Sequence, residues 1–202
     1  MKWNVKRVKH IIAAVSVGLV ISVFAASVGG FAAECRQIRD QVLRLHIIAN
    51  SDIAEDQEVK LLVRDAVLDS SAGVFASSDN KAQAQAEITG KLDEIAMVAK
   101  RVLNENGFNY EAKATLVNMY FETRSYDGMT LPAGYYDAVR IELGAAKGKN
   151  WWCMLYPGFC LPAACKTPDV EDAFGKEGAK IVTANPKYEV RFAIVEWITK
   201  IF

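Results

Sequence analysis

The stretch that decides the fold runs from Ala133 to Cys160 and reads A-G-Y-Y-D-A-V-R-I-E-L-G-A-A-K-G-K-N-W-W-C-M-L-Y-P-G-F-C. From Tyr135 to Leu143, residue character alternates with a period of two, which predicts a half-buried strand. One face would carry Tyr135, Asp137, Val139, Ile141 and Leu143, and the other Tyr136, Ala138, Arg140 and Glu142. The glycine- and lysine-rich segment 144–150 predicts a turn. The apolar run Trp151–Tyr156 suits burial on both faces and predicts a central strand.

A further strand and a helix are predicted upstream. The strand spans Val42–Ala49, with Leu43, Leu45, Ile47 and Ala49 on one face and Val42, Arg44, His46 and Ile48 on the other. Asn50-Ser51-Asp52 ends it, and we expect Asp52 to cap the next helix with Glu55 completing a capping box. Asp56 and Lys60 would form an i,i+4 ion pair on this helix. Its predicted buried stripe is Val59, Leu62, Val63, Ala66 and Val67.

The remaining elements follow from turn signals and periodicity. The small residues of 70–80 predict a break, and a helix over 81–104 follows, with Gly90 as the place for a kink and Asn106-Gly107 as its stop. A long strand is expected over 110–124, followed by a hairpin turn at Asp127-Gly128. In the less regular tail, Thr167-Pro168 and Glu177-Gly178 predict loops, and Val190, Phe192 and Ile194 predict a strand leading into a helix.

This order of elements predicts an α/β (α+β) domain of two layers. Two or three helices would pack on a largely antiparallel sheet, because the long strand with its hairpin argues against a doubly wound parallel sheet. We expect residues 1–33 to form a signal peptide or signal anchor and residues 34–202 to form a single extracytoplasmic domain.

The expectation of export rests on the N-terminus. Residues 11–33 are a run of 23 residues without a charged side chain, preceded by four basic residues. Such a run can span a bilayer, which needs about 20 apolar residues. It can also be a signal peptide, since Ala25-Ala26-Ser27 and Gly30-Phe31-Ala32 offer small residues at a cut. The basic flank places the N-terminus in the cytoplasm and the domain outside.

Charge excludes one class of partner. The whole chain has 24 basic and 24 acidic residues, and removal of residues 1–33 leaves 20 basic and 24 acidic, a net charge of −4. A mildly acidic domain lacks the basic surface that nucleic acid requires, so we expect no nucleic-acid partner.

The four cysteines are Cys35, Cys153, Cys160 and Cys165. An exported domain can keep disulfides, and we take Cys153–Cys160 as the first choice, with Cys160–Cys165 as the second and buried free thiols as the alternative. The C-x6-C spacing does not match a zinc site and no histidine lies nearby to complete one. We expect neither a metal nor a cofactor.

Two residues are candidate catalytic groups. His46 could act as a general base and Cys153 as a nucleophile, which would make the protein a cell-envelope hydrolase. The alternative for His46 is a strand histidine bonded to a neighbouring polar group. The common motifs G-x-S-x-G, H-E-x-x-H and C-x-x-C are absent, which favours a binding protein over an enzyme.

Trp151 and Trp152 are candidates for contact with a protein. Neighbours on a strand point to opposite faces, so if one indole enters the core, the other faces out, where tryptophan anchors protein partners. The alternative is that both faces are covered and both indoles lie in the core.

Two long blocks resemble the signatures of the stage II sporulation protein R family of endospore-forming bacteria. One is L-P-A-G-Y-Y-D-A-V-R-I-E-L-G-A-A-K-G-K-N-W-W-C-M-L-Y-P-G-F-C, and the other is L-R-L-H-I-I-A-N-S-D-I-A-E-D-Q-E-V-K-L-L-V-R-D-A-V-L at 43–68. Ile53 departs from the pattern, in which a serine is usual after S-D.

The resemblance implies a secreted signalling protein that is not an enzyme. Such a protein is exported from the forespore into the space between forespore and mother-cell membranes. There it activates a membrane-embedded protease, which processes an inactive pro-sigma factor in the mother cell. We expect activation by contact, and the membrane itself is involved only through residues 11–33 if they are uncleaved. A membrane-tethered structural protein is a third hypothesis.

We expect two surfaces to make the contact with the protease. The candidate partner-binding residues are His46, Asn50, Ser51, Asp52 and Asp56 at the end of the first strand, and Lys147, Asn150, Trp151 and Trp152 at the turn.

Overall fold

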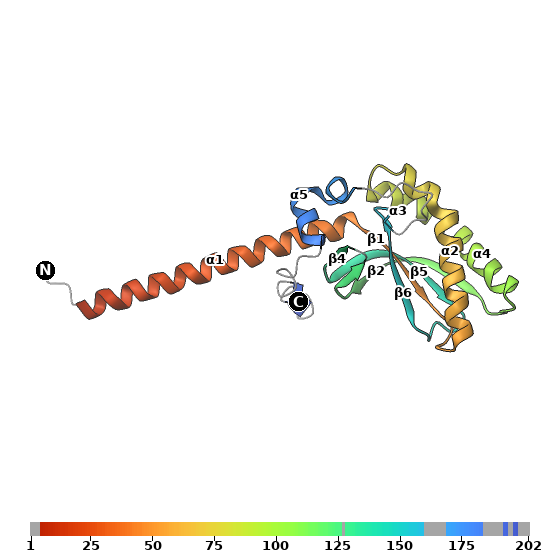
Figure 1. Ribbon diagram of the computed structural model, residues 1–202, viewed down its shortest axis with the longest axis horizontal. Coiled ribbons are helices and arrows are strands. Elements are labelled where there is room, and N and C mark those ends of the chain that lie inside the picture. The colour runs from red at the N-terminus through yellow and green to blue at the C-terminus, as the bar shows by residue number, and fades with distance from the viewer. Residues whose placement is uncertain (1–4, 127, 160–168, 184–191, 194–195, 198–202) are drawn as a thin grey trace.

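The computed structural model describes residues 5–126, 128–159, 169–183, 192–193 and 196–197. A long helix, α1 (Val5–Gln41), projects from a domain in which helices and a curved sheet pack together (Figure 1). The domain has the predicted α+β class.

The sheet has four strands in the order β2–β5–β1–β6, namely β2 (Ala112–Phe121), β5 (Gly134–Leu143), β1 (Leu43–Ile48) and β6 (Asn150–Tyr156). β1 is parallel to β5, while β2 pairs with β5 and β6 pairs with β1 in antiparallel fashion. The sheet is therefore mixed, because two of its three strand pairs are antiparallel and one is parallel.

The prediction that Trp151–Tyr156 is a central strand is wrong, because β6 lies at an edge of the sheet. The run is apolar on both sides because both faces of the sheet are covered where it lies. Burial of two faces does not require a neighbouring strand on each side.

Three helices cover one face of the sheet, here called the helix-covered face. They are α2 (Ala54–Ser77), α3 (Lys81–Thr89) and α4 (Leu92–Glu105). The core beneath them is aliphatic and includes Leu43, Leu45, Ile47, Val59, Val63, Val67, Ile88, Ile95, Val102, Val139, Ile141 and Leu143. These side chains match the predicted strand faces and most of the predicted helical stripe, except that Leu62 is exposed.

The helix boundaries differ from the expected ones at two places. The predicted break over 70–80 is wrong in its first part, because α2 continues to Ser77 and buries Ser71 and Val74. Serine, alanine and glycine are weak guides when packing holds one face of a helix. The kink expected at Gly90 is instead a full break between α3 and α4, while Gly107, with a φ of 83°, follows the end of α4 as predicted.

The opposite face, here called the α1 face, is covered by the last turns of α1, by α5 (Val170–Val182) and by a hairpin of β3 (Arg124–Tyr126) and β4 (Met129–Leu131). Its core is richer in aromatic residues and comprises Phe31, Cys35, Ile38, Val42, Phe121, Met129, Leu131, Tyr136, Ala138, Met154, Phe174, Ile181, Val182 and Phe192. The β3–β4 pairing confirms the predicted hairpin, although residue 127 lies outside the described residues.

Helix α5 was not predicted from the sequence. Glu177-Gly178, predicted as a loop, lies within α5, where Gly178 is buried. A Cβ at Gly178 would lie 3.0 Å from the Cβ of Phe174 on the same helix and 3.6 Å from Ile38 of α1, so α5 packs against α1 at this position at an ordinary contact distance. Thr167, Pro168, Val190 and Ile194 lie outside the described residues, and Phe192 is helical.

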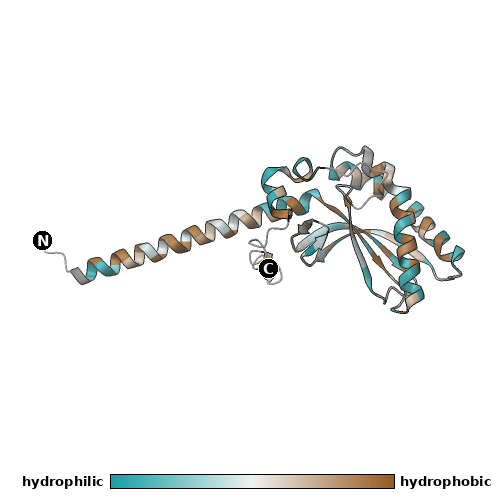
Figure 2. Cartoon of the chain, viewed as in Figure 1, coloured by the Kyte–Doolittle hydropathy of each residue, from teal (hydrophilic) through white to brown (hydrophobic). Residues whose placement is uncertain are grey.

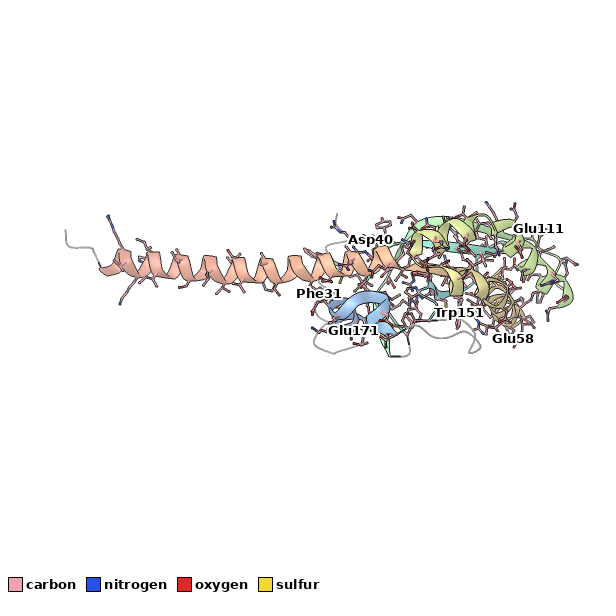
Figure 3. All side chains as sticks on the ribbon, turned by 90° about the horizontal axis from the view of Figure 1, so that it is seen from above. Phe31, Asp40, Glu58, Glu111, Trp151 and Glu171 are labelled. Atoms are coloured by element: carbon pink, nitrogen blue, oxygen red, sulfur yellow. The ribbon has the colours of Figure 1, made fainter. Side chains whose placement is uncertain are left out.

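The apolar first part of α1 is exposed in the described structure. Over the 35 residues from Arg7 to Gln41, its most apolar window has a mean hydropathy of 2.5 and no buried residue, so by length and composition it could cross a membrane (Figure 2). Its side chains stand alone, whereas those of the domain crowd together (Figure 3). The helix continues unbroken past residue 33, and the division into 1–33 and 34–202 stays a prediction.

Candidate interaction surface at the end of β1

The loop between β5 and β6 closes over the end of β1. Because β1 lies between those two strands, residues 144–149 must cross the point at which β1 ends. Backbone N–H groups of the loop donate to the chain that leaves β1: Gly148 to Ala49 O at 2.9 Å, Lys147 to Asn50 O at 3.2 Å, Ala145 to Asn50 Oδ1 at 2.9 Å and Lys149 to Asp52 Oδ1 at 2.7 Å. The two surfaces expected from the sequence are therefore one structure, here called the β1 corner (residues 49–53 and 144–150).

Two glycines allow this close approach. A Cβ at Gly144 would lie 2.3 Å from Asn50 Oδ1, and one at Gly148 would lie 2.1 Å from the carbonyl oxygen of Ser51. Gly144 also has a φ of 57°, which disfavours side chains. The glycine-rich composition of the loop is thus explained by its packing against β1.

Asp52 does not cap α2, so that prediction is wrong, and with it the capping box. The N-cap is Ile53, and no side chain bonds to the first turn there. The carboxylate of Asp52 is occupied by the N–H of Lys149 instead. Sequence spacing cannot separate these two uses of an aspartate, since both satisfy a backbone N–H group.

Asp56, in the first turn of α2, is buried beneath the β1 corner and supports it. Its carboxylate accepts hydrogen bonds from Asn50 Nδ2 at 2.8 Å, Ser51 Oγ at 2.6 Å and Tyr110 OH at 2.7 Å. Burial raises the pKa of Asp56, but these hydrogen bonds outweigh it, so the pKa lies below its ordinary value. Burial and the bond to Asp56 raise the pKa of Tyr110. Tyr110 was missed in the sequence because it lies 54 positions away.

The predicted ion pair between Asp56 and Lys60 is wrong. Lys60 is buried and donates to Gln57 Oε1 at 2.6 Å and to the carbonyl oxygen of Lys149 at 3.1 Å. Burial lowers the pKa of Lys60. Lys60 therefore ties α2 to the loop, while Asp56 ties α2 to the strand end.

His46 lies on the α1 face of β1 and supports Asn150 at the end of the loop. Its Nε2 is 2.8 Å from Asn150 Oδ1, and because an amide oxygen can only accept, Nε2 carries the proton. Its ring stacks on Trp152 with centroids 3.8 Å apart. Burial lowers the pKa of His46 to about 4, against the bond to Asn150, which raises it. The imidazole is neutral at physiological pH.

The geometry does not support a hydrolase that uses His46 or Cys153. Leu45 is paired with Cys153 and His46 with Trp152, so the two candidate groups point to opposite faces of the sheet. Both are buried, with 3% exposure each. A base and a nucleophile must lie within hydrogen-bond reach of each other, and these two do not.

The two tryptophans are each covered on their own face, and neither is an exposed anchor. Trp151 packs against the helix-covered core with the guanidinium of Arg64 4.5 Å from its ring centroid. Trp152 stacks on His46 and meets Phe121 edge-on at 4.9 Å. Both keep partial exposure, which agrees with two covered faces at the edge of a sheet.

What a partner can reach at the corner is a small set of exposed side chains. Among the predicted residues, Asp52, Lys147 and Asn150 are exposed, Asn50, Ser51, Trp151 and Trp152 are partly exposed, and His46 and Asp56 are buried. Ile53 is 57% exposed and adds an apolar side chain to this polar set. The buried members support the exposed ones.

Two of the four cysteines, Cys35 and Cys153, lie in the described part of the chain. Cys153 is buried on the helix-covered face, and Cys160 and Cys165 lie outside the described residues, so the Cys153–Cys160 pair stays a prediction. Cys35 is a free, buried thiol. In the described part of the chain, no three His, Cys, Asp or Glu residues gather in a way that could hold a metal ion.

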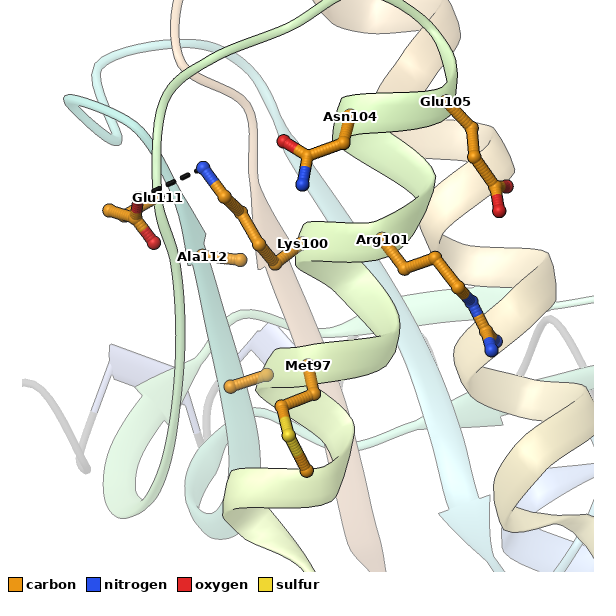
Figure 4. Close-up of a pocket in the computed structure, with 8 residues that line it drawn as sticks. Met97, Lys100, Arg101, Asn104, Glu105, Glu111 and Ala112 are labelled. Atoms are coloured by element: carbon orange, nitrogen blue, oxygen red, sulfur yellow. Dashed lines mark ion pairs between the residues drawn. The ribbon is translucent and has the colours of Figure 1, made fainter.

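A groove of about 400 Å³ between α4 and the start of β2 does not include the corner. It is lined mainly by one side of α4, from which Lys100 reaches Glu111 at 2.9 Å (Figure 4). No predicted site residue lines it, and its residues include no candidate catalytic pair.

Comparison with known proteins identifies the family. A protein-family model described as stage II sporulation protein R matches residues 39–166, which include all six strands and the β1 corner. The chain is 34% identical over 186 residues to stage II sporulation protein R of Bacillus subtilis (strain 168), covering 82% of this chain and 83% of that protein. The chain belongs to the stage II sporulation protein R family. No solved structure matches it.

Membership of the stage II sporulation protein R family confirms the resemblance of the two sequence blocks and implies a role in sporulation. Both blocks meet in the β1 corner, since one contains residues 49–53 and the other the loop 144–150. The matched region begins in the last turn of α1 and excludes its apolar part.

Proposed function

We propose that this protein is a secreted signal between the two compartments of a sporulating cell. It would be exported from the forespore and would activate, by contact, a membrane-embedded protease that processes a pro-sigma factor in the mother cell. Membership of the stage II sporulation protein R family carries this proposal. The apolar N-terminal helix supports export.

The β1 corner is the proposed contact surface. It presents Asp52, Ile53, Lys147 and Asn150 on two backbone segments that hydrogen bonds hold together. A surface that is ordered before binding loses little conformational entropy on contact. Activation further requires that the corner bind the active arrangement of the protease more tightly than the resting one.

The test is a reconstituted cleavage assay with the protease and its substrate in vesicles. The full chain should increase cleavage of the pro-sigma factor. A domain that binds the protease without increasing cleavage would refute activation by contact.

A pair of charge reversals locates the surface. Lys147→Glu should lower activation about tenfold at a fixed subsaturating concentration, because it reverses a charge at the proposed contact. Lys176→Glu, an exposed change on α5, is the matched control and should leave activation unchanged. Equal effects of the two variants would remove the corner from the proposal, and circular dichroism would check that both are folded.

A further inference from the structure

Helix α1 has an exposed apolar part and a part that is buried in the domain. From residue 11 to residue 24, nine large apolar side chains are more than half exposed: Ile11, Ile12, Val15, Val17, Leu19, Val20, Ile21, Val23 and Phe24. From residue 31 onward, one stripe of the same helix is buried in the domain: Phe31, Cys35, Ile38 and, just after the helix, Val42. The spacing of four, three and four residues is that of a single helical face.

The buried stripe makes the end of α1 part of the domain core. Phe31 meets Phe192 edge-on at 5.4 Å, and α1 packs against α5 over several residues. Arg39 donates to the carbonyl oxygen of Ala133 at 3.2 Å and lies so close to Gly134 that a Cβ there would be 2.6 Å from Arg39 Cδ. Removal of the helix up to residue 32 or 33 would take Phe31 out of this core.

Neither candidate cut site has the locally unfolded backbone that a protease needs. Ala25-Ala26-Ser27 and Gly30-Phe31-Ala32 both lie inside the unbroken helix, whereas proteolysis concentrates at exposed, locally unfolded segments. The charge-free run of 23 residues also exceeds the apolar core of a signal peptide, which is roughly 7–15 residues long. The part of this run that precedes the domain, residues 11–28, spans about 27 Å at 1.5 Å per residue, close to the roughly 30 Å hydrocarbon thickness of a bilayer.

We propose that α1 is a retained membrane anchor whose C-terminal turns are built into the domain. The bilayer covers residues from about 11 to 28, and the domain begins at Phe31 with no linker between them. Only Val42 separates α1 from β1, so β1 carries the corner away from the end of the anchor, by about 20 Å for six residues. Figure 1 shows β1 leaving α1 and reaching the far side of the domain, where α2 begins.

This geometry makes the protein a displayed signal rather than a diffusing one. The retained anchor stands without the proposed function, whereas presentation of the corner to a protease in the facing membrane rests on that function. A domain joined rigidly to its anchor samples fewer positions than one on a flexible tether, so its effective concentration at a matching height is higher.

The deciding experiment is the intact mass of the full chain, carrying a C-terminal epitope, recovered from sporulating Bacillus cells. We expect residues 11–33 to be present and the protein to stay in the membrane fraction after a carbonate wash. A mature protein that begins between residues 26 and 34, or release by carbonate, would overturn the proposal. Neither readout depends on cleavage of a pro-sigma factor, so this result and the test of the proposed function can fail separately.

A matched pair of variants tests the anchor directly. Val20→Arg, in the middle of the exposed apolar run, should reduce the carbonate-resistant fraction at least about fivefold, because a charge at the bilayer centre is costly. Glu58→Arg, a comparable change on an exposed position of α2, should leave that fraction unchanged. Unaltered retention of Val20→Arg would show that the membrane association comes from another part of the chain and would contradict the assignment.

Discussion

The two faces of the sheet are built in different ways from the same strands. The helix-covered face of β1 and β5 is aliphatic, and α2, α3 and α4 close it within one continuous stretch of chain. The α1 face of the same strands carries Arg44, His46 and Tyr136, and its cover comes from the N-terminal helix, a hairpin and α5. One face is therefore a local aliphatic core, and the other is an aromatic and polar core assembled from distant segments.

The contrast shows which interactions each face depends on. The helix-covered face is stabilised by burial of apolar side chains, which is non-directional and tolerates apolar substitutions of similar volume. On the α1 face, Arg44 is fully buried with its guanidinium 4.1 Å from the ring centroid of Phe121 and a hydrogen bond to the hydroxyl of Tyr126. Burial lowers the pKa of Arg44, and its Nε and one Nη have no hydrogen-bond partner. We expect the two faces to respond differently to substitution.

The largest effect is expected in the aliphatic core. Ile141→Ala removes a side chain with no exposed surface and should lower the free energy of unfolding by about 4 kcal/mol, through lost burial and a cavity. Urea titration of the full chain in detergent micelles measures this. Lys113→Ala, an exposed change on β2, is the control and should alter the free energy by less than about 0.5 kcal/mol.

The second effect is a pH dependence of stability that arises on the α1 face, from His46. Because the pKa of His46 is about 4 in the folded chain and 6.5 as the ordinary value, the unfolded chain binds a proton first as pH falls. Neutral His46 contributes roughly 3 kcal/mol to the free energy of unfolding above pH 6.5. This contribution is lost as the pH falls from 6.5 to 4. His46→Phe keeps a ring on Trp152 and should flatten this part of the stability–pH curve. An unchanged slope in the variant would show that another group titrates.

The third effect concerns the cover of the α1 face. Phe31→Ala should lower the free energy of unfolding of the domain by about 2 kcal/mol, because Phe31 is 6% exposed in the core. Phe24→Ala, seven residues earlier and 62% exposed, should leave it unchanged. Equal effects would mean that the end of α1 is not part of the domain core.

The smallest effect has the opposite sign. Arg44→Met replaces an incompletely bonded guanidinium with a shorter, flexible apolar chain and should raise the free energy of unfolding by about 1 kcal/mol, since burial of a charge is costly. Thermal unfolding followed by circular dichroism would detect it. A loss of more than about 2 kcal/mol would show that contacts of Arg44 with its neighbours outweigh the cost of burying its charge. Both faces would then depend on every buried side chain in the same way.

The local pattern was a good guide wherever one face of an element is uniformly apolar. Residue alternation placed β1 and β5 and assigned their faces, because side chains on a strand alternate whatever lies around it. The candidate site was predicted in part. Both segments of the β1 corner were chosen from the sequence, whereas their union, through bonds such as Ala145 to Asn50, was not. Residues 95 positions apart leave no local signal of contact.

Polar residues were less predictable than apolar ones. Asp52 satisfies a local rule for a helix start, and Asp56 and Lys60 satisfy the i,i+4 rule for an ion pair. In the fold, each of the three bonds to a different partner. A hydrogen bond depends on which donor lies within about 3 Å, and that is set by packing rather than by spacing. Gly178 likewise predicted a loop, although it lies inside α5 in contact with α1.

By itself, the sequence determined the α+β class, the faces of the central strands, the apolar N-terminal segment and the family, because periodicity and long motifs depend only on neighbouring residues. Only the tertiary structure decided the order β2–β5–β1–β6 and the closure of the β5–β6 loop over β1. It alone placed the end of α1 in the core and put His46 and Cys153 on opposite faces. These outcomes depend on which distant segments exclude water from each other, and the pattern of one segment does not contain that information.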